Sequence, residues 1–370
     1  MDSRVGRLVD FDLREVRISE KTIWRFVVLH DDMGNSGHGE FSYDSAPENI
    51  LVQASKFISS ILDRPATGDS LAAIGADLNF MDLVQATLYS AVEQALLELE
   101  AKSAQVPLWK YLGGRNGKIE IPMYANINRR TVDRSPEGFA KSAAKAVASG
   151  FSWIKIAPFD GVSADTDNRD RIVFDGLDRI NAVRAEIGNR SLMIDCHWRF
   201  SPQNLLDLLS EFSKSQICWL ECPVAETLDN LSDAVAIRNS ANSYGMRVAG
   251  LETHAMWEHF QPFIEANAYD VVMPDIKHCG GYRAFLEIAR NAAEHGVGVS
   301  AHNPTGPIAH LASLHVTAAI GAPEPMEVQF DESPRFFDLT EPVQSSLAPT
   351  SRLPSGAGLG ARLAGQKLSS

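Results

Sequence analysis

Three carboxylates in the middle of the chain each end a short apolar run, and together they could hold a metal ion. They are Asp195, Glu221 and Glu252. Converging negative charges are costly unless a cation neutralises them. A ligand set made only of oxygens favours a hard ion such as Mg²⁺ and leaves coordination positions for a substrate carboxylate. The alternative is that the three acids are solvated or salt-bridged. A shared role explains better why three successive runs each end in an acid.

A histidine and an aspartate at the ends of two later runs could move a proton. Asp275 ends one run and His302 ends the next. A carboxylate bonded to one ring nitrogen orients an imidazole and raises its basicity, so the other nitrogen can accept a proton. The pair predicts a general base, and the alternative is a histidine paired with a structural acid.

Further polar residues follow the same pattern. His197 lies two residues beyond Asp195, and strand alternation predicts that it shares the side of that carboxylate, with Arg199 at the next matching position. His254 has the same relation to Glu252. Candidates to bind substrate are therefore Lys155, Arg199, Glu327, Asn126 and His254.

The elements that must position these residues repeat along the second part of the chain. Short apolar runs, each followed by an amphipathic stretch, end at Asn126, Lys155, Asp195, Glu221, Glu252, Asp275, His302 and Glu327. Each interval has room for a strand, a helix and two loops. Eight such units predict a (β/α)8-type barrel, whose active site lies at the carboxyl ends of its strands.

The chain before and after these repeats has a different character. The β-rich run 23–29 and the helical periodicity of residues 82–102 predict an α+β capping domain over residues 1–118. The barrel then occupies residues 119–330. A Ser-, Pro- and Gly-rich segment, 331–370, is expected to return to the capping domain.

Composition narrows the possible partners and locations. The 370 residues include 34 Lys and Arg against 47 Asp and Glu, a net charge of −13, which argues against nucleic acid as a partner. No apolar run is long enough to span a membrane, and the N-terminus lacks a signal-peptide pattern, so a cytoplasmic protein is expected. The cysteines, expected to be reduced thiols, are Cys196, Cys218, Cys222 and Cys279.

In its residues and their order, the chain resembles the enolase superfamily, specifically the mandelate-racemase-like subgroup. The resemblance includes the Gly37-His-Gly-Glu40 motif and the acid in Pro325-Met-Glu327. It implies that Asp195, Glu221 and Glu252 bind Mg²⁺ and that His302 with Asp275 removes a proton α to a carboxylate. The family stabilises the resulting enediolate on the metal. Homo-oligomers are common among these relatives, so one is expected here.

One departure from the family pattern bears on the reaction. Many relatives carry a Lys-x-Lys pair, and here Lys155-Ile-Ala157 replaces the second lysine, a base, with alanine. This loss counts against racemisation. The Asp195-Cys-His197 triplet and the Asn303–Ile308 segment instead resemble acid-sugar dehydratases of the galactonate dehydratase type. Which of His197 and His254 supplies the second acid or base stays open.

These observations predict a Mg²⁺-dependent hydro-lyase. The expected substrate is a small hydroxylated carboxylate, an aldonate or aldarate. His302 would take the α-proton, His197 would help expel the β-hydroxyl as water, and the product would be a 2-keto-3-deoxy acid. The alternatives are a racemase, epimerase or cycloisomerase of a related acid, and a noncatalytic metal-binding protein.

Overall fold

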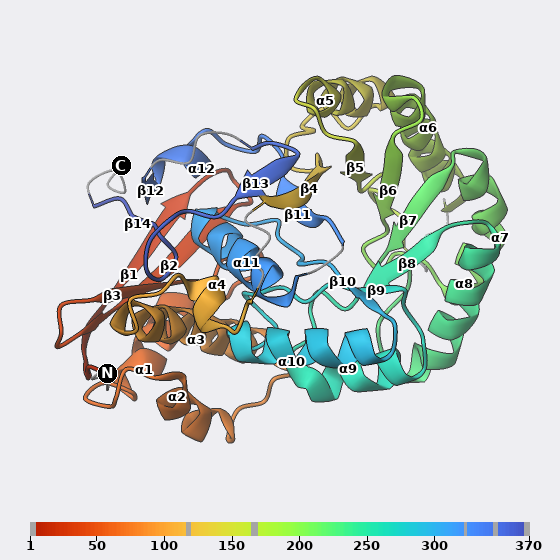
Figure 1. Ribbon diagram of the computed structural model, residues 1–370. Coiled ribbons are helices and arrows are strands. Elements are labelled where there is room, and N and C mark those ends of the chain that lie inside the picture. The colour runs from red at the N-terminus through yellow and green to blue at the C-terminus, as the bar shows by residue number, and fades with distance from the viewer. Residues whose placement is uncertain (1–4, 116–119, 164–168, 322–323, 343–346, 366–370) are drawn as a thin grey trace.

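The computed structural model describes residues 5–115, 120–163, 169–321, 324–342 and 347–365. Figure 1 shows two units, a small antiparallel sheet with helices beneath it and a curled parallel sheet with helices outside it. The predicted α/β class, with a capping unit and a barrel-type sheet, is confirmed.

The N-terminal unit is an antiparallel sheet packed on a long helix. Its strands, in the order β1-β2-β3, are β1 (Leu8–Arg17), β2 (Ile23–Asp31) and β3 (Ser36–Glu40). Its helices are α1 (Ile50–Ser59), α2 (Gly68–Gly75), α3 (Leu83–Ser103) and α4 (Leu108–Tyr111). Helix α3 matches the expected helix at 82–102, and Asp82 caps it by accepting the Val84 N–H at 2.9 Å.

The Gly37-His-Gly-Glu40 motif joins this unit to the rest of the molecule. A Cβ at Gly39 would lie 1.9 Å from the Ala91 carbonyl oxygen, so only glycine lets β3 approach α3 this closely. Glu40 is fully buried and accepts the N–H groups of Gly306 and Ala309 at 2.9 Å each. These groups belong to the first turn of α11 (Pro307–Ile320), where a carboxylate is favoured.

The second unit is built on eight parallel strands that alternate with helices. The strands are β4 (Glu120–Asn126), β5 (Trp153–Ile156), β6 (Ser191–Asp195), β7 (Ile217–Glu221), β8 (Arg247–Gly250), β9 (Val271–Val272), β10 (Gly298–Val299) and β11 (Met326–Gln329). The intervening helices are α5 (Pro136–Ala148), α6 (Arg169–Ile187), α7 (Pro202–Lys214), α8 (Leu231–Ser243), α9 (Met256–Glu265), α10 (Gly281–Glu294) and α11. Each polar residue that was predicted to end an apolar run lies at the end of a strand or within three residues of it.

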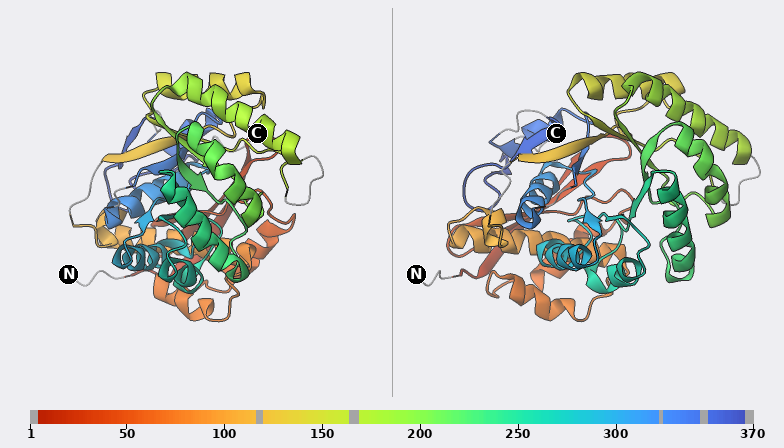
Figure 2. Two further views of the ribbon diagram at one scale, coloured as in Figure 1. Left: turned by 90° about the vertical axis from the view of Figure 1, so that its right-hand side faces the viewer. Right: turned by 45° about the vertical axis from the view of Figure 1, so that its right-hand side comes forward.

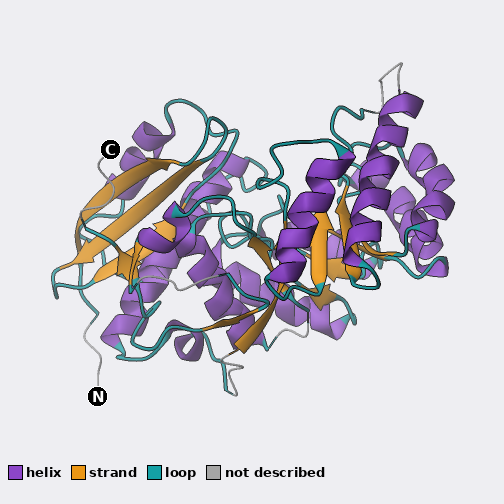
Figure 3. Cartoon of the chain, turned by 90° about the horizontal axis from the view of Figure 1, so that it is seen from above, coloured by secondary structure: helices purple, strands orange, loops and turns teal. Residues whose placement is uncertain are grey.

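The parallel strands curl into a ring. Neighbouring strands pair in chain order from β4 to β10, and β11 pairs with β4. Between the β10 and β11 segments, the Glu327 N–H donates to the Ala301 carbonyl at 3.4 Å. The further views show the helices outside these strands (Figures 2 and 3). This curvature brings the carboxyl ends of the strands to one mouth.

The C-terminal segment contacts both units. Strand β13 (Thr350–Arg352) pairs antiparallel with β4, and β12 (Thr340–Glu341) pairs with β14 (Arg362–Leu363), while α12 (Arg335–Asp338) precedes them. The Leu108 N–H of α4 donates to the Gly358 carbonyl at 2.8 Å. This part of the tail thus lies beside α4 of the N-terminal unit.

The described helices do not include one with the length and apolar character needed to cross a bilayer. The four cysteines are all free thiols, as expected.

Candidate active site

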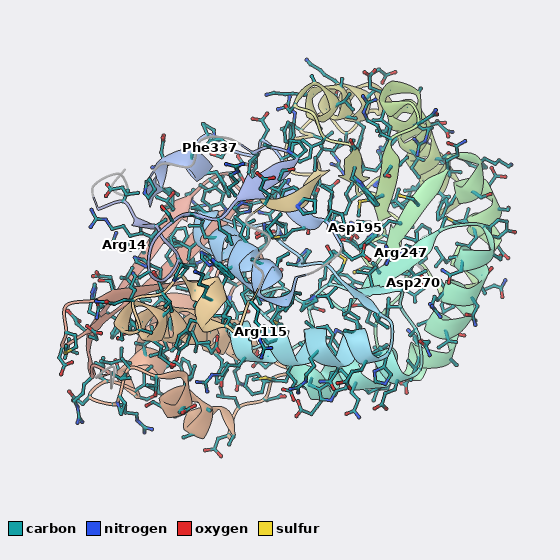
Figure 4. The ribbon with its side chains drawn as sticks, viewed as in Figure 1. Arg14, Arg115, Asp195, Arg247, Asp270 and Phe337 are labelled. Carbon is teal, nitrogen blue, oxygen red and sulfur yellow. The ribbon has the colours of Figure 1, made fainter. Side chains whose placement is uncertain are left out.

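A cavity of about 350 Å³ opens where the carboxyl ends of the strands meet the N-terminal unit. Its barrel residues are Asn126, Asn128, Arg129, Asp195, His197, Trp198, Glu252, Thr253, Lys277, His278, His302, Pro304 and Gln329. The N-terminal unit adds Trp24, Ser42, Tyr43, Asp44 and Leu83. Figure 4 labels Asp195 on the inner side of the ring of strands. Of the predicted site residues, the cavity therefore collects Asn126, Asp195, His197, Glu252 and His302.

Asp275 orients His302 at the cavity wall. His302 Nδ1 lies 2.9 Å from Asp275 Oδ2, which leaves Nε2 as the ring atom available to accept a proton. Asp275 is fully buried, and although burial alone would raise its pKa, the nearby Lys277, His278 and His302 hold that pKa well below its usual range. The carboxylate is therefore ionised and serves as a fixed hydrogen-bond acceptor.

Helix α3 of the N-terminal unit fixes the loop that carries Asp275. Gln94 Nε2 donates to the Ile276 carbonyl at 3.0 Å, and the Gly280 N–H donates to Ser90 Oγ at 2.9 Å. Thr87 Oγ1 lies 2.8 Å from His278 Nδ1. The N-terminal unit thus supports the loop that carries Asp275 directly, a relation between distant segments that sequence spacing did not reveal.

The three predicted metal ligands lie near one another and repel. Burial raises the pKa of Glu221 to about 8, and the charges of Asp195 and Glu327 add to the rise while Lys155 opposes it. Burial, then the charges of Asp195 and Glu221, raise the pKa of Glu252 well above its usual range. For Asp195, burial is outweighed by His197 and Lys155, which lower its pKa to about 2.

An oxygen of Glu252 has the character of an unused metal ligand. Glu252 Oε2 is buried and has no hydrogen-bond partner, although His302 Nε2 lies 3.3 Å away in a geometry that makes no hydrogen bond. Asp195 Oδ2 instead lies 2.7 Å from His197 Nε2. The donor set of three repelling carboxylates fits a divalent cation. As arranged here, however, no three His, Cys, Asp or Glu side chains of the described residues form a ready metal cluster.

Lys155 lies beneath the cavity rather than in its wall. It is fully buried, forms an ion pair with Glu221, and has its Nζ 2.8 Å from Glu327 Oε1. Asn126 Nδ2 donates to the same Glu327 oxygen at 2.6 Å, so Glu327 and Asn126 belong to this network, although Asn126 also reaches the cavity. The lysine expected to bind substrate is thus already paired with two carboxylates and does not line the cavity.

Arg199 and His254 are not brought to the cavity. Arg199 Nη1 donates to the Val162 carbonyl at 3.2 Å. The His254 ring packs edge-on against Phe260 and Phe263, and burial lowers its pKa to about 4. Strand alternation does not extend to either residue, because the backbone leaves the extended conformation before reaching them.

The backbone at these strand ends is strained. His197 and Trp198 have φ of 47° and 57°, Cys222 after Glu221 has 42°, and Leu251 before Glu252 has 72°. Left-handed conformations are unfavourable for such side chains and cluster at functional sites. The turn at His197 nevertheless leaves its ring against Asp195, as the spacing predicted.

Sequence reasoning missed the contribution of the N-terminal unit to the cavity. Tyr43 and Asp44 follow β3 without a recognisable motif, and their position depends on how the two units dock. Asp44 Oδ2 accepts a hydrogen bond from Arg129 Nη2 at 2.7 Å, which links the cap loop to the loop after β4. Glu40, which lies three residues before Tyr43 in the Gly37-His-Gly-Glu40 motif, was the sequence signal that this segment faces the barrel.

Comparisons with known proteins identify the family. Residues 138–367, more than half of the chain, match the family described as Enolase C-terminal domain-like, and the protein belongs to that family. It is an enolase-superfamily enzyme of the mandelate-racemase-like type, and by homology to curated dehydratases it is of the dehydratase (hydro-lyase) class. The resemblance inferred from sequence is therefore confirmed.

Two curated relatives illustrate the homology. D-xylonate dehydratase of Haloferax volcanii is 25% identical over 327 residues, which cover 84% of this chain and 76% of the relative. D-galactonate dehydratase of Verminephrobacter eiseniae is 25% identical over 298 residues, covering 79% and 75% of the two chains.

Solved structures agree on the fold across nearly the whole chain. A mandelate racemase/muconate lactonizing enzyme from Sulfitobacter sp. superposes with a TM-score of 0.86 at 20% identity, covering 97% of this chain and 93% of that one. A member of the enolase superfamily from Salmonella Typhimurium gives 0.84 at 20% identity, with 98% of each chain covered.

Proposed function

We propose that this protein is a Mg²⁺-dependent dehydratase of an acid sugar, an aldonate or aldarate. The observation that carries the proposal is the His302–Asp275 pair, which faces the same cavity as Asp195, His197 and the unpartnered oxygen of Glu252. The names of the curated relatives, which act on xylonate and galactonate, support the substrate class.

His302 is the proposed general base. With Nδ1 on Asp275, its Nε2 takes the proton from the carbon α to the substrate carboxylate. The buried, ionised Asp275 stabilises the imidazolium that results, because the two opposite charges then share one hydrogen bond. Ala157 offers no second base, which favours elimination over racemisation.

His197 is the proposed general acid. Its side chain is 40% exposed at the cavity, so it can reach a β-hydroxyl, and it donates the proton with which that hydroxyl leaves as water. In this structure its Nε2 lies 2.7 Å from Asp195 Oδ2. His254 lies in an aromatic pocket with a depressed pKa and is not assigned this role.

Asp195, Glu221 and Glu252 are the residues that would hold Mg²⁺. When bound, the ion supplies Lewis-acid stabilisation of negative charge on the substrate carboxylate. For these side chains the consequence is a rearrangement, because Asp195 would release His197 and Glu221 would share its oxygens with Lys155.

The test is incubation of the protein with Mg²⁺ and pooled acid sugars in D₂O, followed by proton NMR and mass spectrometry. Dehydration gives loss of water and a new deoxy methylene signal. Deuterium incorporation without loss of water would replace this proposal with an epimerase or isomerase. No exchange and no product across the pool, with the protein folded and Mg²⁺ bound, would favour a noncatalytic protein.

A further inference from the structure

Lys277 has hydrogen-bonding capacity that the described structure does not use. Its Nζ donates to Asp275 Oδ2 at 2.5 Å, and among the described residues its side chain makes no other hydrogen bond or ion pair. An ammonium group has three N–H donors. The side chain is 4% exposed and lines the cavity, so its remaining donors have little access to bulk water.

The other cations near the cavity are already committed. Lys155 is enclosed by Glu221 and Glu327 below the cavity floor. Arg129 lines the cavity, but its guanidinium bonds Asp44 at 2.7 Å and Glu332 at 3.4 Å. Of these three side chains, Lys277 is the one that has a single acidic partner and also lies beside the proposed base.

Lys277 and His302 share one acceptor, Asp275 Oδ2. This common oxygen holds the ammonium and the imidazole side by side on the same wall of the cavity. Both side chains line the cavity, so one substrate bound there can contact the two together. A cation in this position also stabilises the negative charge that grows on the substrate as its proton leaves.

We propose that Lys277 binds a carboxylate oxygen of the substrate, because it lines the cavity and has a single acidic partner. This inference rests on the proposed acid-sugar function and adds the residue that recognises the acid. A lysine that only held Asp275 in place would change turnover but not the preference for an acid over a neutral polyol, so the two roles are separable.

The experiment compares binding of aldonates with binding of the matching alditols. Calorimetry in Mg²⁺ would use D-xylonate, D-gluconate and D-galactonate, paired with xylitol, D-glucitol and galactitol, which carry CH₂OH in place of the carboxylate. For Lys277→Gln, we expect the Kd of a bound aldonate to rise on the order of 10- to 100-fold, with alditol binding unchanged. Lys214→Gln, at a side chain 68% exposed, is the matched control.

Lys277→Arg is a second variant, for the case that Lys277→Gln does not fold. It keeps the positive charge and should retain the preference for aldonate over alditol. An unchanged aldonate Kd in folded Lys277→Gln, with wild-type protein still dehydrating an acid sugar, would overturn this inference alone. If wild-type protein neither binds nor dehydrates any of the three aldonates, the inference falls together with the proposed function. A fall in kcat at constant Kd would reduce Lys277 to a positioning residue.

Discussion

His302 Nδ1 lies 2.9 Å from Asp275 Oδ2 although 27 residues separate them in the chain. The contact arises because β9 and β10 are neighbouring parallel strands, and an isolated bridge between Asp275 and His302 continues their pairing. The geometry that defines the proposed base is therefore set by backbone pairing.

Replacing His302 by Asn should abolish proton transfer and leave the fold intact. The amide can keep a hydrogen bond to Asp275 but cannot accept a proton at neutral pH, so α-proton exchange should fall by about 10²- to 10⁴-fold. Exchange in D₂O, followed by NMR, measures the change. His295→Asn, at an exposed position at the end of α10, should exchange like wild type. Normal exchange in His302→Asn would remove His302 from the mechanism.

Mg²⁺ should stabilise the wild-type protein more than a Glu252→Gln variant. The ion relieves repulsion among buried carboxylates, and ligand at 100 times its Kd adds about 2.7 kcal/mol to the free energy of unfolding. An amide at position 252 removes one charged ligand and should abolish most of that gain. Thermal midpoints with and without Mg²⁺ test this. Equal shifts in both proteins would show that Mg²⁺ binds without Glu252.

The barrel and the order of its polar strand ends were predictable, because hydrophobic runs and their spacing are local properties. Asn126, Asp195 and Glu221 end their strands as expected. Side-chain direction was predictable only while the backbone stayed extended. Beyond Leu251, whose φ is 72°, His254 turns into an aromatic cluster instead of the cavity.

How deeply a side chain is buried, and how the two units pack together, could not be predicted from the spacing of residues in the sequence. Lys155 and Lys277 are both lysines near strand ends, yet one lies under the floor between two carboxylates and the other in the cavity wall. Likewise, Tyr43 reaches the cavity because two units separated in sequence pack together. Such distinctions depend on the three-dimensional position of neighbouring charges.

Removing the Lys155 charge should destabilise the protein. Lys155→Met leaves Glu221 and Glu327 buried without their cation, and breaking such a pair typically costs about 3–5 kcal/mol. Urea unfolding measures the loss. Lys214→Met is the control, because its partner Glu211 is exposed and such surface pairs contribute about 0–1 kcal/mol. Equal stability of the two variants would contradict a structural role for Lys155.

Glu93 should make stability depend on pH at the junction of the two units. It is buried in α3 and accepts the Tyr282 and Arg283 N–H groups at 2.7 and 3.2 Å. Burial raises its pKa to about 7 from 4.5, although these hydrogen bonds oppose the rise. The folded protein therefore keeps a proton that the unfolded chain releases. This contribution is fully present below pH 4.5 and is lost as the pH rises through about 7.

The shift corresponds to a loss of about 3 kcal/mol in the free energy of unfolding across that interval. Urea unfolding between pH 4.5 and 8 would measure it, and Glu93→Gln should flatten this part of the profile because an amide does not titrate. The slope is the informative quantity, since the amide also replaces one acceptor with a donor and lowers stability at every pH. Identical slopes in the two proteins would assign the pH dependence to other groups and leave Glu93 as a hydrogen-bond acceptor only.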